Sequence, residues 1–215
     1  MFPTIFVTFS LLLNLVTGPV PNTMDNRHLL ASRSYSLEDR YADKWVSDIF
    51  KDNILLAVAY LRGYEKTQDV NWAAVEKPFH YEFTLKPGET FAFHDDILPE
   101  FKNSVIKTTG SHFNWSEGYK SDGWLVGDGV CHLASFINWV ARDAGLEVVS
   151  PTRHDFAVIP DVPRDYGVSI YANPMTSGSN ELQNLYIKDN KSNPVEMDFD
   201  FDGHNLKVSI FSIDK

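Results

Sequence analysis

The chain has 215 residues, of which 43% are hydrophobic and 13% aromatic, and its formal charge at pH 7 is −10. This composition suits a folded domain with a full core and excludes a disordered chain. The acidic excess argues against the basic surface that nucleic-acid binding requires, so we expect no nucleic-acid partner. The single cysteine, Cys131, excludes an internal disulfide and any zinc site that needs several cysteines.

The N-terminal residues form a nearly continuous apolar run without a charge, from Phe2 to Gly18. The run is shorter than the roughly 20 residues of a membrane-spanning helix, and it resembles the apolar part of an export signal that lacks the usual preceding Lys or Arg. We therefore expect residues 1–18 to be a signal or membrane anchor and the protein to be extracytoplasmic, either secreted or membrane-tethered. A buried strand or helix of a cytosolic protein is the alternative.

Residues 19–45 are polar and mixed, which predicts a linker, and residues 46–215 then form one domain. The first strong helix is expected from Ser47 to Gly63, with Ser47 as N-cap and Gly63 at the C′ position. Alternating aromatic and polar residues between His80 and Asp95, interrupted by the sequence KPGE, predict a strand, a turn and a second strand.

A second helix is expected directly after the sequence GDGV, because apolar residues recur there with helical spacing until Gly145 stops it. Strands are expected at 146–149 and 165–172 and in three segments of the C-terminal tail. The order of helix, strand pair, helix and several strands indicates an α+β fold, in which a mostly antiparallel sheet packs against two or three helices behind the apolar leader.

Five motifs occur in the order expected of a VanW-like domain: LKPGETFAFHD, SEGYK, GDGVCHLASFINWVARDAGLEVV, RHDFAV and PRDYGVSIY. The resemblance covers about residues 70–212. It implies a bacterial cell-envelope protein that works near peptidoglycan; the family takes its name from vancomycin-resistance gene clusters. The chain departs from the family pattern at Asp128, where a third glycine is usual, and at His132, where a glutamine is common.

Cys131 suggests thiol chemistry. A helix N-terminus lowers a thiol pKa, and nearby free amides could receive an oxyanion. A thiol hydrolase also needs a base and a group that orients it. We expect His154, at the start of a neighbouring strand, to be the base and Asp165 to be the orienter, with Asp155 and Asp161 as weaker candidates.

Each of these three residues also has an ordinary structural interpretation. Cys131 could be a small core residue, His154 could bond the backbone, and Asp165 could be a turn residue or a partner of Arg164. A zinc site formed by Cys131, His132 and His154 is geometrically awkward, because adjacent helix positions point about 100° apart. We therefore expect no metal and no cofactor.

The loop NWSEGYKSDGW carries aromatic residues that could stack on a sugar or peptide: Trp115, Tyr119 and Trp124. With Gly129 and His132 they form the predicted substrate-binding set, although the aromatic residues could instead pack on the core. Two functions follow. One is a cysteine-dependent acyl transferase or amidohydrolase acting on peptidoglycan peptides. The other is a non-catalytic module that binds the cell wall or has a structural role.

Overall fold

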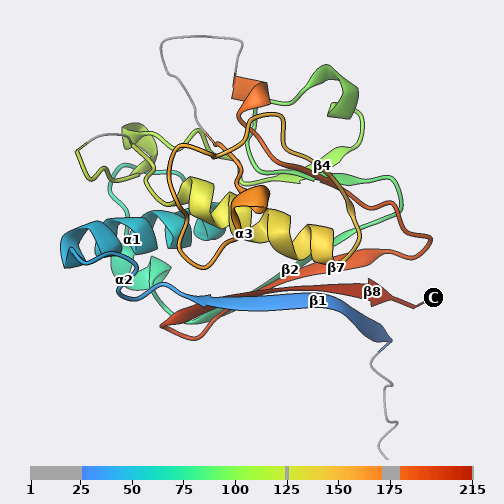
Figure 1. Cartoon of the computed structure of the whole chain (residues 1–215), viewed down its shortest axis with the longest axis horizontal. Coiled ribbons are helices and arrows are strands. Elements are labelled where there is room, and N and C mark those ends of the chain that lie inside the picture. The colour runs from blue at the N-terminus through green and yellow to red at the C-terminus, as the bar shows by residue number, and fades with distance from the viewer. Residues whose placement is uncertain (1–25, 124–125, 171–179, 215) are drawn as a thin grey trace, which may run out of the picture.

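The structure is a computed structural model that describes residues 26–123, 126–170 and 180–214. The described residues form two four-stranded sheets and three α-helices, which confirms the predicted α+β class (Figure 1). Residues 1–18, predicted as a leader, lie outside the described part of the chain. Within the described ranges no helix has both the length and the apolar character needed to cross a membrane.

The larger sheet is wholly antiparallel and carries the longest strands of the described residues. Its order is β1 (Arg27–Ser36), β8 (Asn205–Ile213), β7 (Val195–Phe201) and β2 (Phe79–Leu85). The helices lie on one side of this sheet in Figure 1. The alternating side chains of β7 and β8 that face the helices are apolar and buried, whereas the opposite face carries polar side chains.

The smaller sheet is mixed. Its order is β4 (Val105–Thr108), β3 (Thr90–Ala92), β6 (Tyr186–Lys188) and β5 (Glu147–Val149). Only the β3–β4 pair is parallel. The predicted strand, turn and strand are present, with Glu89 donating its amide to the Lys86 carbonyl across the turn at 2.8 Å. The turn joins strands of different sheets, because β2 pairs with β7 and β3 with β6.

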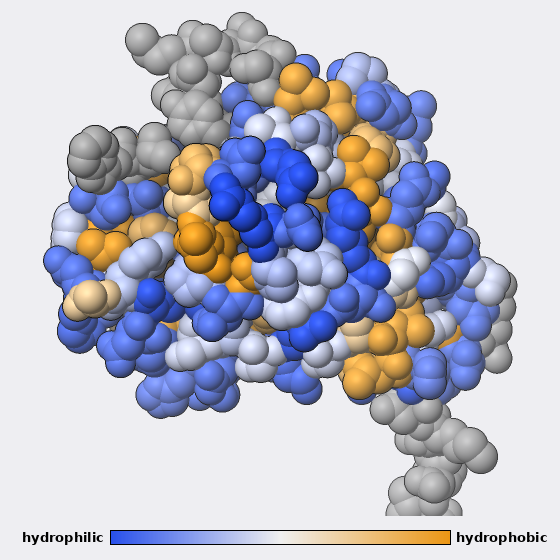
Figure 2. Space-filling model, in the orientation of Figure 1, coloured by the Kyte–Doolittle hydropathy of each residue, from blue (hydrophilic) through white to orange (hydrophobic). Residues whose placement is uncertain are grey.

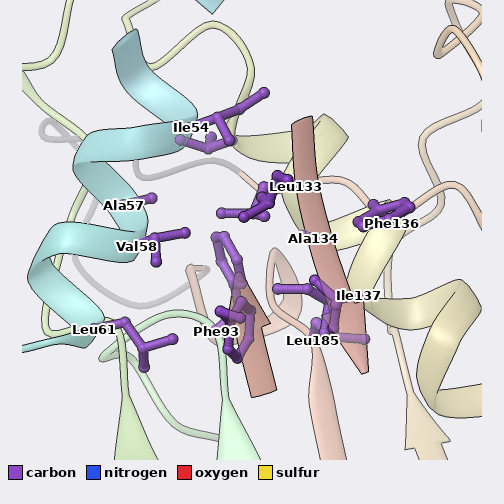
Figure 3. Close-up of a cluster of buried hydrophobic side chains, with 14 of the residues drawn as sticks. Ile54, Ala57, Val58, Leu61, Phe93, Leu133, Ala134, Phe136, Ile137 and Leu185 are labelled. Carbon is purple, nitrogen blue, oxygen red and sulfur yellow. The ribbon is translucent and has the colours of Figure 1, made fainter. Parts of the chain in front are cut away.

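The core lies between two long helices and the sheets. The helices are α1 (Lys44–Leu61), α3 (Val130–Asp143) and the short α2 (Trp72–Val75). Buried side chains of α1 face those of α3, and Phe93 and Leu185 lie beside them (Figure 3). Nearly every residue of the second half of α1 is buried, which explains its unbroken apolar sequence.

The predicted end of the first helix is correct, but its predicted start is wrong. Gly63 has a left-handed backbone with φ of 89°, as a C′ glycine requires. The helix begins at Lys44, and Asp43 caps it by accepting from the Trp45 amide. Ser47 instead lies inside the helix, where its hydroxyl bonds the backbone of Tyr41.

The predicted linker at residues 19–45 is also corrected for its described part. Residues 27–36 form β1, which pairs with β8 from Arg27–Ile213 to Ser36–Asn205. Residues 44 and 45 already belong to α1. The folded unit therefore includes β1 and does not begin at residue 46.

The segment after β5 contains turns instead of the predicted strands. The short 3₁₀ helix η3 (Arg164–Tyr166) precedes residues 167–170, of which Val168 forms an isolated bridge to Arg153, and residues 171 and 172 of the predicted strand lie outside the described residues. His154 therefore does not begin a strand. The remaining 3₁₀ helices are η1 (Pro99–Phe101), η2 (Trp115–Glu117) and η4 (Asn180–Leu182).

Candidate functional site

The cysteine lies at the N-terminus of α3, as the sequence predicts. The helix begins at Val130, one residue before Cys131, and Gly129 precedes it with φ of 101°. A Cβ atom on Gly129 would stand 2.7 Å from the Phe50 carbonyl oxygen. Gly129 therefore lets α1 and α3 approach each other, a structural task besides its place on the wall of the pocket described next.

A pocket of about 130 Å³ opens beside this helix start. Its walls include Tyr41 and Phe50 from the α1 region, Cys131 and His132 from α3, and His154 and Phe156 from the loop before η3. Gly129 and Asp128 also line it. The structure thus brings His154 to the same cavity as Cys131 and His132 of α3, although it comes from a separate segment of the chain.

The loop that leads into Cys131 is held by a buried amide. Asn53, fully buried in α1, donates to the carbonyls of Lys120 and Asp128 at 3.0 and 2.8 Å. Its Oδ1 accepts from the Lys120 amide at 2.8 Å. These three bonds satisfy backbone groups at both ends of the loop, so α1 fixes the position from which α3 starts.

The thiol of Cys131 is bonded to the backbone of Ile170. Sγ donates to the Ile170 carbonyl at 3.2 Å and accepts from the Ile170 amide at 3.3 Å. Burial raises the pKa of the Cys131 thiol to about 11; the Ile170 amide lowers it less, and Asp128 raises it further. The direction is opposite to the one expected for an activated nucleophile.

His132 is a neutral, buried imidazole. Its ring lies 4.8 Å from the ring of Phe50, and its Nε2 bonds the Tyr41 hydroxyl at 3.4 Å. Burial, and then the charge of Arg40, lower the His132 pKa to about 3. Its Nδ1 is buried without a hydrogen-bond partner among the described residues, so the ring keeps an unused donor or acceptor.

His154 reaches the same pocket from the other side. Its ring lies 6.3 Å from that of His132 and 4.0 Å from that of Phe156. Burial lowers the His154 pKa more than hydrogen bonding to the backbone of His154 and Ala157 raises it, so this imidazole is also neutral at pH 7. In the described part of the chain its Nδ1 has no hydrogen-bond partner either. His154 therefore has the uncharged state of a base, but Sγ of Cys131 bonds Ile170 instead.

Asp165 does not orient His154. Its side chain is 93% exposed, and its carboxylate pairs with Arg153 at 3.3 Å. It lies in η3, whose backbone turns the carboxylate to solvent instead of returning it along a strand. The weaker candidate Asp161 pairs with Arg40 at 3.6 Å. The predicted Cys–His–Asp triad is therefore not assembled in this structure.

Asp128, the departure from the family's glycine pattern, lies on the pocket wall. Its Oδ2 accepts from the Asp122 amide at 2.8 Å. Burial raises the Asp128 pKa to about 6, and the charge of Asp122 adds to the shift. The only carboxylate that we place on this wall is thus ionised mainly above pH 6.

The aromatic residues of the predicted substrate-binding set do not gather at the pocket in the described residues. Tyr119 is fully buried, with its ring 5.9 Å from that of Tyr60 and 5.5 Å from that of Phe113, so it is a core residue. Trp115 is 58% exposed in η2 and does not line the pocket. Trp124 lies outside the described residues.

The aromatic side chain at the pocket rim is instead Phe156. It is 70% exposed, and Val158 nearby is also largely exposed. The face of the molecule in Figure 2 is mostly polar, with separate apolar patches. Three wall residues were not predicted from the sequence: Tyr41, Phe50 and Phe156. Phe156 stands in the motif RHDFAV next to His154, and that proximity could have suggested it.

A family model described as VanW like protein matches residues 70–211. The chain belongs to the VanW-like family. Neither the search of curated proteins nor the search of solved structures gave a significant match. The VanW-like match begins after β1 and α1. Yet α1 supplies Phe50 to the pocket wall and Asn53 to hold the loop that leads into it, and β1 is an edge strand of the larger sheet. The folded unit is therefore longer than the matched region.

Proposed function

We propose that this VanW-like protein binds a small polar group of a cell-wall peptide in the Cys131 pocket, and that Cys131 lines the pocket without acting as a nucleophile. The observation that carries the proposal is the pair of unpartnered Nδ1 atoms on His132 and His154, two residues that line one cavity. Buried polar atoms are normally hydrogen-bonded, so unpartnered atoms on two residues that line one cavity could be satisfied by a ligand once the side chains turn toward it.

The size of the pocket limits what it holds. A volume of about 130 Å³ is small beside the roughly 300–1,000 Å³ of pockets that enclose a drug-sized ligand. This is room for a terminal amide or amine with a short side chain, and too little for a sugar ring with its neighbours. A peptide end is therefore a better match than a glycan, and exposed Phe156 at the rim can pack on the rest of the peptide.

The charges of the pocket narrow the ligand further. Both imidazoles are neutral at pH 7 because burial lowers their pKa, whereas burial raises the pKa of Asp128 only to about 6. The wall thus carries a negative charge and two neutral rings. These groups favour an amide or an amine over a free carboxylate.

We further propose that the protein works in the bacterial envelope, either tethered by residues 1–18 or secreted.

Binding tests this proposal directly. Titration calorimetry with purified, soluble peptidoglycan fragments should detect binding to the full chain. Cys131→Ser should bind within about threefold of wild type, because it keeps a small polar side chain. Phe156→Ala and His154→Ala should each weaken binding by tenfold or more. Trp115→Ala, an equally exposed aromatic side chain outside the pocket, is the matched control and should bind normally.

The same protein tests the enzymatic alternative. Incubation with whole sacculi should release no new amino groups, and iodoacetamide labelling of Cys131 should rise only well above pH 8.5, because burial raises its pKa. Release of peptides that disappears in Cys131→Ser would establish a thiol hydrolase and refute our proposal. Absence of binding to every fragment by folded wild-type protein would refute the binding function itself.

A further inference from the structure

A second group of ionisable side chains lies far from the pocket, on the face of the larger sheet that points away from the helices. β2 is the edge strand here and pairs with β7, which places His80 opposite Asp200 and Glu82 opposite Asp198. The residues that alternate with these acidic residues on β7, such as Met197 and Phe199, are buried in the core. The outer face therefore gathers an imidazole and several carboxylates.

These groups are close enough to share one ion. His80 Nδ1 lies 2.8 Å from an Asp200 oxygen and 3.2 Å from an Asp198 oxygen, and Nε2 lies 3.3 Å from Glu82. One ligand atom each from His80, Glu82 and Asp198 falls within 4.8 Å of the other two. In the described part of the chain no other set of three His, Cys, Asp or Glu side chains meets this condition.

Asp198 is a buried member of this group, and among the described residues its ion-pair partner is the half-exposed imidazole of His80. Asp198 is only 6% exposed, and its Oδ1, which faces His80, is buried without a hydrogen bond among the described residues. A carboxylate buried in this way is unfavourable unless a charge or a metal compensates it. An exposed acidic cluster would carry no such penalty, so Asp198 distinguishes this group from an ordinary polar surface.

The local charges point to a cation. Four carboxylates gather here: Glu82, Glu196, Asp198 and Asp200. Their ion pairs involve one guanidinium, that of Arg27 at 2.7 Å from Glu196 and 3.6 Å from Glu82, and the imidazole of His80. Lys207 of β8 also stands opposite Asp200 in the strand register. Even with His80 protonated, these three cations leave the four carboxylates in excess. A divalent ion would balance that excess.

We propose that His80, Glu82 and Asp198 bind one divalent transition-metal ion, with Asp200 within reach as a further ligand. A mixed set of imidazole and carboxylate suits Zn²⁺, whereas Ca²⁺ and Mg²⁺ prefer oxygen ligands alone. Zinc–ligand distances of about 2.1 Å put tetrahedral ligand atoms roughly 3.4 Å apart, so small side-chain shifts complete the site. The ion would join the edge strand β2 to β7.

Zinc binding to the untagged full chain tests the proposal. Calorimetric titration with ZnCl₂ at pH 7 should give one site per chain, and zinc should raise the melting temperature. His80→Ala should weaken zinc binding at least a hundredfold, and Glu82→Gln and Asp198→Asn at least tenfold each. Glu82 is half-exposed, so its variant should fold even if Asp198→Asn does not; circular dichroism without zinc checks both.

Two control variants keep the result specific. His204→Ala removes an exposed imidazole that pairs with Glu38 near the β7–β8 turn, and it should bind zinc as wild type does. Cys131→Ala should also bind normally. The proposal is overturned if folded wild-type protein takes up no zinc, which would leave Arg27, Lys207 and protonated His80 to balance the carboxylates of the cluster. Unchanged affinity in Glu82→Gln and His80→Ala, or loss of the site in Cys131→Ala, would overturn it equally.

Discussion

The pocket beside α3 and the outer face of the larger sheet both contain histidines, and their surroundings drive these histidines in opposite directions. In the pocket, burial lowers the pKa of His132 and His154, and both rings stay neutral. On the sheet, the hydrogen bond to Asp200 raises the pKa of His80, with further help from Asp198 and Glu82. The residue type alone therefore assigns no chemistry; desolvation or neighbouring charge decides it.

The two regions also differ in how they are held. The pocket rests on buried backbone contacts, namely the bonds of Asn53 and the close approach of Gly129 to Phe50. The outer cluster, formed by His80 and Glu82 of the edge strand β2 and Asp198 and Asp200 of β7, depends on side chains, several of them half-exposed. A substitution in the pocket scaffold should therefore act mainly on stability, and one in the cluster mainly on charge and ion binding.

The largest expected effect comes from Asn53→Leu. The substitution leaves one buried amide and two carbonyls of the 120–128 loop without partners, which should reduce the free energy of unfolding by about 4 kcal/mol. His80→Ala, from the outer cluster, is the comparison and should change it by less than about 1 kcal/mol. Urea unfolding of both variants measures this. Equal losses would mean that the two regions do not differ as described.

A smaller effect is expected from pH, which should change the free energy of unfolding with opposite sign in the two regions. The folded-state pKa of His132 is about 3, well below the 6.5 of an unperturbed histidine. The unfolded chain therefore binds the proton first, and His132 alone should remove about 3 kcal/mol of stability between pH 7 and pH 4. Urea unfolding at both pH values tests this. Between pH 7 and pH 4 the free energy of unfolding of His132→Phe should fall by about 3 kcal/mol less than that of wild type.

His80 provides the opposite case in the same experiment. Its folded-state pKa is raised, so its protonated form stabilises the protein below pH 6.5, and this stabilisation is lost as pH rises through the folded value. His80 is half-exposed, so the contribution is small. NMR titration of the imidazoles should show His80 changing above pH 6.5 and His132 far below it. A midpoint near 6.5 for both would refute the contrast.

Local patterns predicted much of the fold. The helix that contains Cys131, its end at Gly145 and the strands of the tail follow from periodicity and turn residues. β1 was missed because its polar-rich sequence lacks a clear apolar alternation, and only its pairing with β8 makes it a strand. The strand expected at 165–172 failed because the chain there turns into η3 before extending.

The sites were harder to predict, because they depend on contacts between distant segments. Periodicity placed Cys131 at a helix start, but the bonds from Ile170 and the burial that raises the thiol pKa come from tertiary packing. In the outer cluster, the register of β2 with β7 brings residues 80 and 82 close to residue 198. Acidic residues at alternate positions 196, 198 and 200 were the available signal, since such alternation puts them on one face.

The smallest expected effect is that of Asp165→Asn. Because its carboxylate is exposed and pairs with Arg153, the substitution should change unfolding free energy by less than about 0.5 kcal/mol. It should also leave the iodoacetamide labelling rate of Cys131 within about twofold of wild type. Asp128→Asn is the matched control, since the Asp128 charge raises the thiol pKa; its removal should speed labelling severalfold.

If Asp165→Asn slowed labelling tenfold while Asp128→Asn did nothing, Asp165 would act on the pocket in solution. The loop from 153 to 167 would then have to rearrange so that η3 turned inward, and the triad that this structure leaves apart would form there.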